Sequence, residues 1–458
     1  MRKLIDMTRV LIPTGALGLG YDRAALALGV ANRPDIIAVD GGSTDSGPSY
    51  LGRGVSKYSR GSTKAEWREL MQARAEARVP LVIGTAGTCG ADAAVDWLFQ
   101  ITEELAAELG QKLRVTRLYS GQNATFLAKA LVDGRVTPLP AAPPISADIL
   151  AACTNIVALA GAEQIQAALA TGADIVIAGR TTDTALIAAL PLLRGDHAGA
   201  AWHGAKVGEC GAIATTNPAS GTIQIDFDAR GFTFTPLGAT ARATPYTVSA
   251  HMLYENSDPF ILHEPGGHLD VTAARYQALN QREVRVEGSK WVPGPYTVKL
   301  EGARIAGYQT VALALLRDRR YVENARAWAD DVITQTRARV AARLGLASDT
   351  YDLEIRLIGI DASLGALENH RPLPAEVGAL AIVTAPTEAL AAEIAKMANP
   401  YLLHHALEED EPMPTFAFPF SPAEMQRGAL YEFCLNHVLH SADPMAPFRL
   451  VVTEVGND

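Results

Sequence analysis

A short polar stretch that can bind an anion follows an apolar run near the middle of the chain. Arg180, Thr182 and Asp183 come directly after Ile175–Ala178 in the segment GADIVIAGRTTDT. The apolar run predicts a strand, the following ALIAALPLL predicts a helix, and ligands of open α/β sheets bind beyond the carboxyl ends of strands. We therefore expect Arg180 and Thr182 to bind substrate and Asp183 to orient the arginine or the substrate. The structural alternative is that Thr182 or Asp183 caps the helix while Arg180 forms a local ion pair.

A glycine-rich loop near the N-terminus is a second candidate for anion binding. Gly15, Gly18 and Gly20 follow the first apolar run, and Asp22 stands where the next helix is expected to begin. Backbone amides of such a loop can approach an anion at a helix N-terminus. Asp40 ends the second predicted strand at about the distance at which a dinucleotide-binding fold places its ribose-binding acid. The order GALGLG differs from GxGxxG, so a tight turn with a helix cap is the alternative interpretation.

Polar loops also follow other predicted strands. Residues 41–52 are rich in glycine and hydroxyl groups, residues 84–92 can form a backbone-lined anion cradle, and residues 120–123 follow the fourth strand. Such loops either bind ligands or only connect elements. We expect the following residues of these loops to contact substrate: Ser43, Asp45, Thr85, Gly87, Thr88, Ser120 and Asn123.

Two pairs of titratable residues stand in the second half of the chain. His251 and Glu255 are four positions apart, so on a helix they share a face and can hold a substrate or a divalent metal. Lys299 and Glu301 share a face if YTVKLEGAR is a strand, and can serve as an acid and a base. The alternatives are an ordinary surface pair and a simple ion pair. As cofactors, a divalent metal at His251 and Glu255 and NAD or a nucleotide at the glycine loop are both considered.

The apolar runs that position these residues predict an α/β fold. Between residues 9 and 183, runs such as DIIAVD, NIVALAG and DIVIAG alternate with polar loops and amphipathic stretches, and their Val, Ile and Leu residues are continuous. This pattern is typical of a mostly parallel sheet with crossover helices, which we predict for a domain of residues 1–200 with ligand loops at the strand ends. Alternating runs such as TIQIDFD predict antiparallel strands. We therefore predict a mixed α+β second domain, residues 201–458, with a C-terminal α/β appendage.

The composition of the chain excludes several classes of protein function. The 458 residues carry a formal net charge of −10, which argues against nucleic acid as a partner because no basic tract offsets phosphate repulsion. The 4 cysteines lie far apart without a CxxC pair, which disfavours a structural zinc site or a disulfide framework. Neither a signal peptide nor a membrane span is predicted. We expect a cytoplasmic protein with a small-molecule substrate.

Several motifs, in this order along the chain, resemble one protein family. They are ADIVIAGRTTDTAL, ENSDPF, EPGGHLD, SKWVP with YTVKLEGA, and NHVLHSADPMAPFR. Together they resemble the AtuA family of acyclic terpene utilisation proteins over nearly the whole chain. PTGALGLGYDR departs from the more usual glycine and alanine loop, which indicates a side branch. The resemblance implies a role in bacterial catabolism of branched carboxylic acids and terpenoids, often as CoA thioesters.

The resemblance and the residues together favour a lyase or hydro-lyase (hydratase or dehydratase) acting on a branched carboxylate or its CoA thioester. Such a reaction needs a base for the α-proton, an acid for the hydroxyl and donors that hold the enolate. Lys299 with Glu301, or His251 with Glu255, can supply the first two, and Arg180 with the glycine-loop amides the third. The alternatives are a nucleotide- or NAD-dependent enzyme and a non-catalytic subunit of a heteromeric enzyme. We expect a homo-oligomer, with a partner subunit as a further option.

Overall fold

The computed structural model describes residues 7–370 and 372–456 and divides into two compact units. Unit 1 combines the chain up to Arg304 with the segment from Phe433 onward, and unit 2 is Ile305–Glu432. The predicted division into 1–200 and 201–458 does not coincide with these units. Residues just beyond 200 belong to unit 1 because β8 (Ile223–Phe227) pairs along its whole length with β1 (Thr8–Ile12).

Unit 1 is built on a ten-stranded mixed sheet in the order β12-β13-β9-β8-β1-β2-β3-β7-β4-β20. The central strands β1, β2, β3, β7 and β4 are parallel to one another, whereas the strands toward both edges are antiparallel. The predicted α/β fold class is thereby confirmed. The remaining strands of this sheet are β2 (Ile36–Asp40), β3 (Leu81–Gly84), β4 (Leu113–Tyr119), β7 (Ile175–Ala178), β9 (Gly231–Pro236), β12 (Arg275–Ala278), β13 (Val284–Glu287) and β20 (Arg449–Val455).

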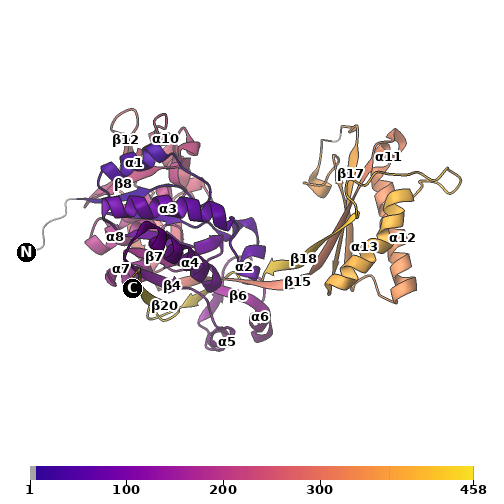
Figure 1. The fold of residues 1–458 in the computed structure, drawn as a ribbon, viewed down its shortest axis with the longest axis horizontal. Helices are drawn as coiled ribbons and strands as arrows, with labels where there is room; N and C mark the ends of the chain where they lie inside the picture. Colours follow the sequence, from indigo (N-terminus) through magenta and orange to yellow (C-terminus); the bar gives the residue numbers. More distant parts are fainter. Residues whose placement is uncertain (1–6, 371, 457–458) are drawn as a thin grey trace, which may run out of the picture. The chain divides into compact units, whose positions relative to one another are not determined.

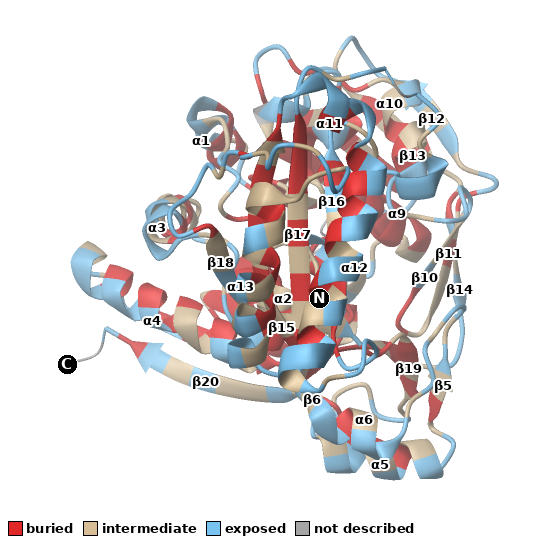
Figure 2. Cartoon of the chain, turned by 90° about the vertical axis from the view of Figure 1, so that its right-hand side faces the viewer, coloured by how far each residue is buried: buried red, intermediate tan, exposed pale blue. Residues whose placement is uncertain are grey.

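Helices cover both faces of this sheet, as continuous apolar strands require. One face packs against α1 (Arg23–Ala31), α3 (Arg60–Ala77) and α4 (Asp92–Leu109), which Figure 1 shows on the viewer's side. The other face packs against α7 (Ala162–Ala170), α8 (Ala185–Arg194) and α9 (Ala198–Gly208). In α4, Val95, Leu98 and Leu105 are buried at helical spacing, and Figure 2 shows the resulting stripe of buried residues along one side.

Two smaller antiparallel arrangements complete unit 1. The long strand β15 (Thr297–Leu316) begins there and pairs with β6 (Cys153–Ala158) and β19 (His437–His440), which in turn pairs with β5 (Val136–Pro138). One of the predicted parallel strands is therefore wrong, because β6 joins this arrangement and not the central sheet. The helices α5 (Ala124–Val132) and α6 (Ala147–Ala152) pack on it, and β10 (Ile261–Glu264), β11 (Gly267–Asp270) and β14 (Lys290–Pro293) form a separate small sheet.

Unit 2 is a small α/β module around the second part of β15. There β15 pairs with β17 (Val377–Ala385), which pairs with β16 (Asp352–Ile358), and β18 (Glu424–Phe433) also pairs with β15. Its helices are α11 (Arg319–Glu323), α12 (Ala325–Leu344) and α13 (Glu388–His404), and buried Trp328 and Val332 of α12 pack in one apolar core with Ala381 of β17. An α/β appendage was predicted in this part of the chain.

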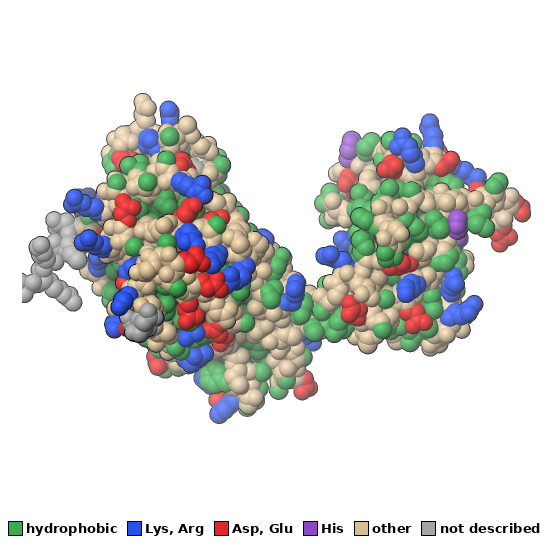
Figure 3. All heavy atoms as spheres, in the orientation of Figure 1, with side chains coloured by type: hydrophobic (Ala, Val, Ile, Leu, Met, Phe, Trp, Pro, Cys, Tyr) green, Lys and Arg blue, Asp and Glu red, His purple; other side chains and the backbone are tan. Residues whose placement is uncertain are grey.

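Acidic and basic side chains are interspersed on the face of unit 1 that carries α3 and α4. Figure 3 shows this mixture, and Lys64 of α3 accounts for part of it by pairing with Glu104 at 2.8 Å and Glu108 at 2.7 Å on α4. Such exposed pairs contribute little to stability, on the order of 1 kcal/mol or less each. Among residues 7–370 and 372–456, no helix combines the length and apolar character needed to cross a membrane.

Candidate active site

A cavity of 610 Å³ in unit 1 lies where polar loops follow the central parallel strands. The loops after β1 and β2 form one part of its wall, and the segments around residues 210–221 and 254–255 form another. Its position agrees with the general rule that ligands of open α/β sheets bind beyond the carboxyl ends of strands. Eight residues expected from the sequence to belong to a site line it: Gly15, Gly20, Asp40, Ser43, Asp45, Thr88, Asp183 and Glu255.

Arg180 is the centre of a buried ion network behind this cavity. It lies two residues after the end of β7 and is 6% exposed. Its Nε donates to Oε2 of Glu301 at 3.1 Å, its Nη1 donates to Oδ1 of Asp183 at 3.3 Å, and the same Nη1 donates to Oγ1 of Thr85 at 3.2 Å. Thr44 donates to Glu301 at 3.0 Å as well. Arg180 therefore forms the local ion pair of the structural alternative, and the network also links the loops after β2, β3 and β7 to β15.

Lys299 and Glu301 share one face of β15, as their alternation predicted. The Nζ of Lys299 lies 3.4 Å from Oε1 of Glu301, and the lysine side chain is 43% exposed whereas that of Glu301 is 7% exposed. Neither residue lines the 610 Å³ cavity. Glu301 reaches that cavity only through Arg180 and Asp183, so its geometry is that of a residue that holds Arg180 in place.

The loop after β3 has a backbone that β-branched residues rarely adopt. Thr85 has φ of 45° and Thr88 has φ of 72°, a region where non-glycine residues are uncommon and where strain of about 1–3 kcal/mol collects at functional sites. Gly90, with φ of 64°, completes the loop, and a side chain there would strike the backbone of Arg180. This conformation brings Thr88 to the cavity and the Thr85 hydroxyl to Arg180.

The carboxyl groups around Arg180 ionise differently. Burial raises the pKa of Asp40 well above its usual value, and the charge of Asp183 adds to this, against Arg180 and the amides of residues 41 and 42. Burial also raises the pKa of Asp183, against the attraction of Arg180. Burial opposes the ionisation of Glu301, but the charge and hydrogen bonds of Arg180 outweigh this effect and lower its pKa. Oδ1 of Asp40 is buried and has no hydrogen-bond partner among the described residues.

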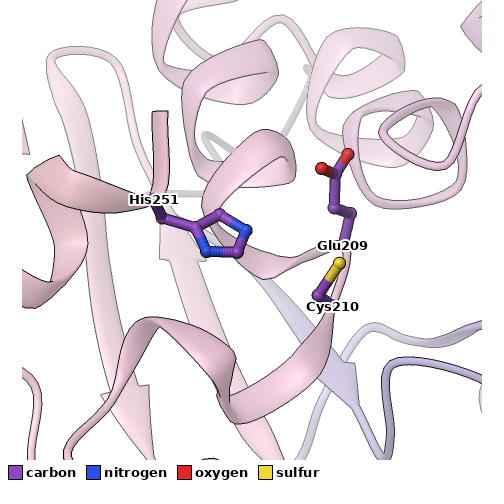
Figure 4. A group of neighbouring side chains, drawn as sticks. All are labelled: Glu209, Cys210 and His251. Carbon is purple, nitrogen blue, oxygen red and sulfur yellow. The ribbon is translucent and has the colours of Figure 1, made fainter. Parts of the chain in front are cut away.

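His251 and Glu255 do not form the helical pair that their spacing predicted. Helix α10 (Pro245–Ala250) gives way to a 3₁₀ turn, η5 (His251–Leu253), and Glu255 then has φ of 51°, so the two side chains do not share a helical face. Glu255 lines the cavity, whereas His251 is buried and stacks on Tyr254 with ring centroids 5.2 Å apart. Figure 4 shows the residues that do lie beside His251, Glu209 and Cys210 from the end of α9.

Two further buried carboxyl groups belong to the same part of unit 1. Burial raises the pKa of Glu209 to about 8, although Lys206 pairs with it at 2.5 Å and opposes this rise. Burial likewise raises the pKa of Glu264 to about 7, against hydrogen bonds from Thr184 and Thr182. Oε2 of Glu264 lacks a hydrogen-bond partner among the described residues. Raised carboxyl pKa values of this kind are typical of sites where a proton is held for transfer.

Other residues expected to bind substrate have structural contacts instead. Asp22 caps α1 by accepting hydrogen bonds from the amides of residues 24 and 25, so fewer amides at that end of the helix are available to bind a phosphate. Asn123 caps α5 in the same manner. The amide of Gly18 donates to Glu66 at 2.7 Å.

Three more residues that were expected to contact substrate, Ser120, Thr182 and Gly87, support the loops around Arg180. Ser120 accepts a hydrogen bond from the amide of Arg180 at 2.7 Å, Thr182 bonds the hydroxyl of Thr184 at 3.1 Å, and Gly87 packs against Ala94. They therefore contribute to positioning, and none of them lines the 610 Å³ cavity.

Sequence reasoning missed several residues of the cavity wall. Lys57, Tyr58, Cys210, Ile213 and Tyr254 all line it. Lys57 follows the polar loop at residues 41–52, and its position after that loop was the available signal. No sequence signal pointed to Cys210, because it reaches the cavity wall only where its loop approaches the loop of Gly15. The approach is so close that a side chain at Gly15 would lie 2.7 Å from the carbonyl oxygen of Cys210.

Comparison with known proteins identifies the family. Searches for similar curated proteins and for similar solved structures found no match. The family model described as acyclic terpene utilisation family protein AtuA matches residues 56–409, which includes Arg180, Asp183 and Glu301 and the segments that carry Glu209, Cys210 and His251. The chain therefore belongs to the AtuA family of acyclic terpene utilisation proteins.

Proposed function

We propose that this protein is a lyase or hydro-lyase that adds or removes water in a branched carboxylate or its CoA thioester. The observation that carries the proposal is the opposed ionisation of the carboxyl groups around Arg180. Burial raises the pKa of Asp40, which lies in the cavity wall, whereas the charge and hydrogen bonds of Arg180 lower the pKa of Glu301. Environments that separate the pKa values of neighbouring acids in this way assign them different tasks.

The roles follow from position. Asp40 lines the cavity and would protonate the departing hydroxyl, so that it leaves as water. Glu255 lines the same cavity and would take the α-proton of the substrate. The backbone amide of Gly15 would donate to the enolate oxygen. Glu301 does not touch this space and would act by positioning Arg180 and, through it, Asp183.

The wall of the cavity also suits a branched acyl substrate with an acidic group. Leu19, Ile213 and Pro218 offer apolar surface for the acyl chain. Lys57 is the basic residue among the described residues that line the cavity, and its Nζ donates to Ser46 at 2.7 Å. An ammonium group there can hold a carboxylate or a phosphate of CoA. Membership of a terpene utilisation family adds a reason to expect branched, acyclic substrates.

Calorimetric titration tests the substrate class directly. The purified chain is titrated with branched carboxylic acids, their CoA thioesters, CoA alone and NAD. We expect binding of a branched acid or thioester and a dissociation constant raised about tenfold in Lys57→Ala, which corresponds to about 1.4 kcal/mol. Lys129→Ala is the control, because Lys129 of α5 pairs only with Asp133, the residue after that helix, among its described ion pairs. Binding of NAD and none of the acids or thioesters would oppose the proposal.

A further inference from the structure

Glu209, Cys210 and His251 bring three metal-ligating side chains together in unit 1. One ligand atom from each, a carboxylate oxygen, a sulfur and a ring nitrogen, can be chosen so that all lie within 4.8 Å of one another. Figure 4 shows the imidazole of His251 directed toward the other two side chains. Tetrahedral zinc bound at about 2.0–2.3 Å holds its ligands about 3.3–3.8 Å apart. Small rotations of the side chains would close the remaining distance.

The ring of His251 supplies independent support for a ligand at this point. His251 is 4% exposed, and its Nε2 has no hydrogen-bond partner among the described residues. A buried nitrogen without a partner costs free energy unless something binds it. Neutral imidazole is a common metal ligand, so a metal would satisfy the nitrogen that the protein leaves unpaired.

The elements that carry these residues favour a cation. Glu209 and Cys210 follow the C-terminus of α9, where the aligned peptide dipoles place partial negative charge. This helix is buried along its length, with Trp202 and Val207 in the core, so the position of its end is well defined. The ammonium group of Lys206 already binds in this negative environment: its Nζ donates to Oε1 of Glu209 and, at 2.8 Å, to the carbonyl oxygen of Tyr254. The other carboxylate oxygen of Glu209 remains for a metal.

From this geometry we infer that Glu209, Cys210 and His251 bind a divalent metal of the zinc type. One thiolate, one imidazole and one carboxylate suit Zn²⁺, and the thiol proton of Cys210 would pass to solvent on binding. Cys210 and Tyr254 also line the 610 Å³ cavity. A metal with three protein ligands keeps a fourth position, which here would face the cavity and accept an oxygen atom of water or substrate. The inference stands apart from the proposed function, because metal binding is measured without turnover.

Cobalt substitution tests the ligand set. The full chain is stripped with a chelator and titrated with Co²⁺ while absorbance is recorded, and Zn²⁺ content is measured by mass spectrometry after reconstitution and desalting. We expect about one metal per chain, visible bands of a tetrahedral site and a near-ultraviolet band from thiolate to cobalt. Cys210→Ser should lose the thiolate band, and His251→Gln should weaken Co²⁺ binding tenfold or more.

Cys153→Ser is the matched control, since the sulfur of Cys153 lies 3.0 Å from that of Cys434 and neither belongs to the proposed site. This variant should keep the full cobalt spectrum. The wild-type spectrum and stoichiometry decide the question even if a variant fails to fold. An absence of Co²⁺ and Zn²⁺ binding by the wild-type chain, or a thiolate band that survives in Cys210→Ser or disappears in Cys153→Ser, would overturn the inference.

Discussion

Arg180 and Glu301 stand 121 residues apart in the sequence and form an ion pair at 3.1 Å in which both side chains are less than 10% exposed, at 8% and 7%. One follows β7 of the central sheet and the other belongs to β15, so the pair joins two different sheets of unit 1. A buried charge that loses its partner is costly. The pair therefore fixes the end of β7, where Asp183 enters the cavity wall.

Replacing Glu301 should destabilise the fold. In Glu301→Gln the ion pair of Arg180 with Glu301 is lost and, among the described ion pairs of Arg180, only that with Asp183 remains, so we expect the free energy of unfolding to fall by about 3 kcal/mol. Urea denaturation of both proteins measures this. The control is Lys299→Gln, which removes a pair whose lysine is 43% exposed and should cost no more than about 1 kcal/mol. Equal effects of the two substitutions would contradict the assignment of Glu301 to Arg180.

Glu264 should make stability depend on pH. Its pKa is raised to about 7 in the folded state, from 4.5 in the unfolded chain. Between these values the folded state holds a proton that the unfolded state has lost, so its contribution to stability falls as the pH rises through this window. The unfolding free energy of Glu264→Gln minus that of the wild type should grow by up to about 3 kcal/mol from pH 4.5 to pH 7. A difference that stays constant, measured by denaturation at several pH values, would show that the folded carboxyl titrates normally.

Gly90 should tolerate no side chain because the backbone of Arg180 occupies the space. Gly110 is a matched comparison: its φ of 63° is close to the 64° of Gly90, but a side chain there would meet nothing within 4 Å. Gly110→Ala should cost about 1–2 kcal/mol, the strain of a left-handed residue. Gly90→Ala should cost clearly more, since it also displaces the loop that carries Arg180. Thermal unfolding of the two variants compares them, and similar losses would mean that the close approach is unimportant.

Local pattern was sufficient to predict much of the central sheet and part of the site. Strand β7 is Ile175–Ala178 as its apolar run predicted, and the alternation around Lys299 correctly indicated a strand. β6 was misplaced because a short apolar run is compatible with either a parallel or an antiparallel neighbour. His251 and Glu255 were paired on helical periodicity, which fails where the chain changes to a 3₁₀ turn.

The features that the sequence did not predict depend on contacts between segments that are distant along the chain. The group of Glu209, Cys210 and His251 depends on α9 meeting the turn after α10, and no spacing in the sequence records that meeting. The burial that raises the pKa of Asp40 likewise belongs to the folded chain. For the same reason the division between units escaped prediction, because residues after Phe433 return to unit 1.

The most direct test of the proposed function measures water addition. The protein is incubated with branched 2-enoyl-CoA thioesters in water labelled with oxygen-18, and the masses of the products are measured by mass spectrometry. We predict labelled 3-hydroxyacyl products and a rate about 100-fold or more lower in Asp40→Asn, because the amide cannot accept the proton of the attacking water, the reverse of the carboxyl's role in dehydration. Asp133→Asn should be unchanged because that residue is on the surface beside Lys129. No labelled product from any thioester, or an Asp40→Asn rate equal to that of the wild type, would contradict the account.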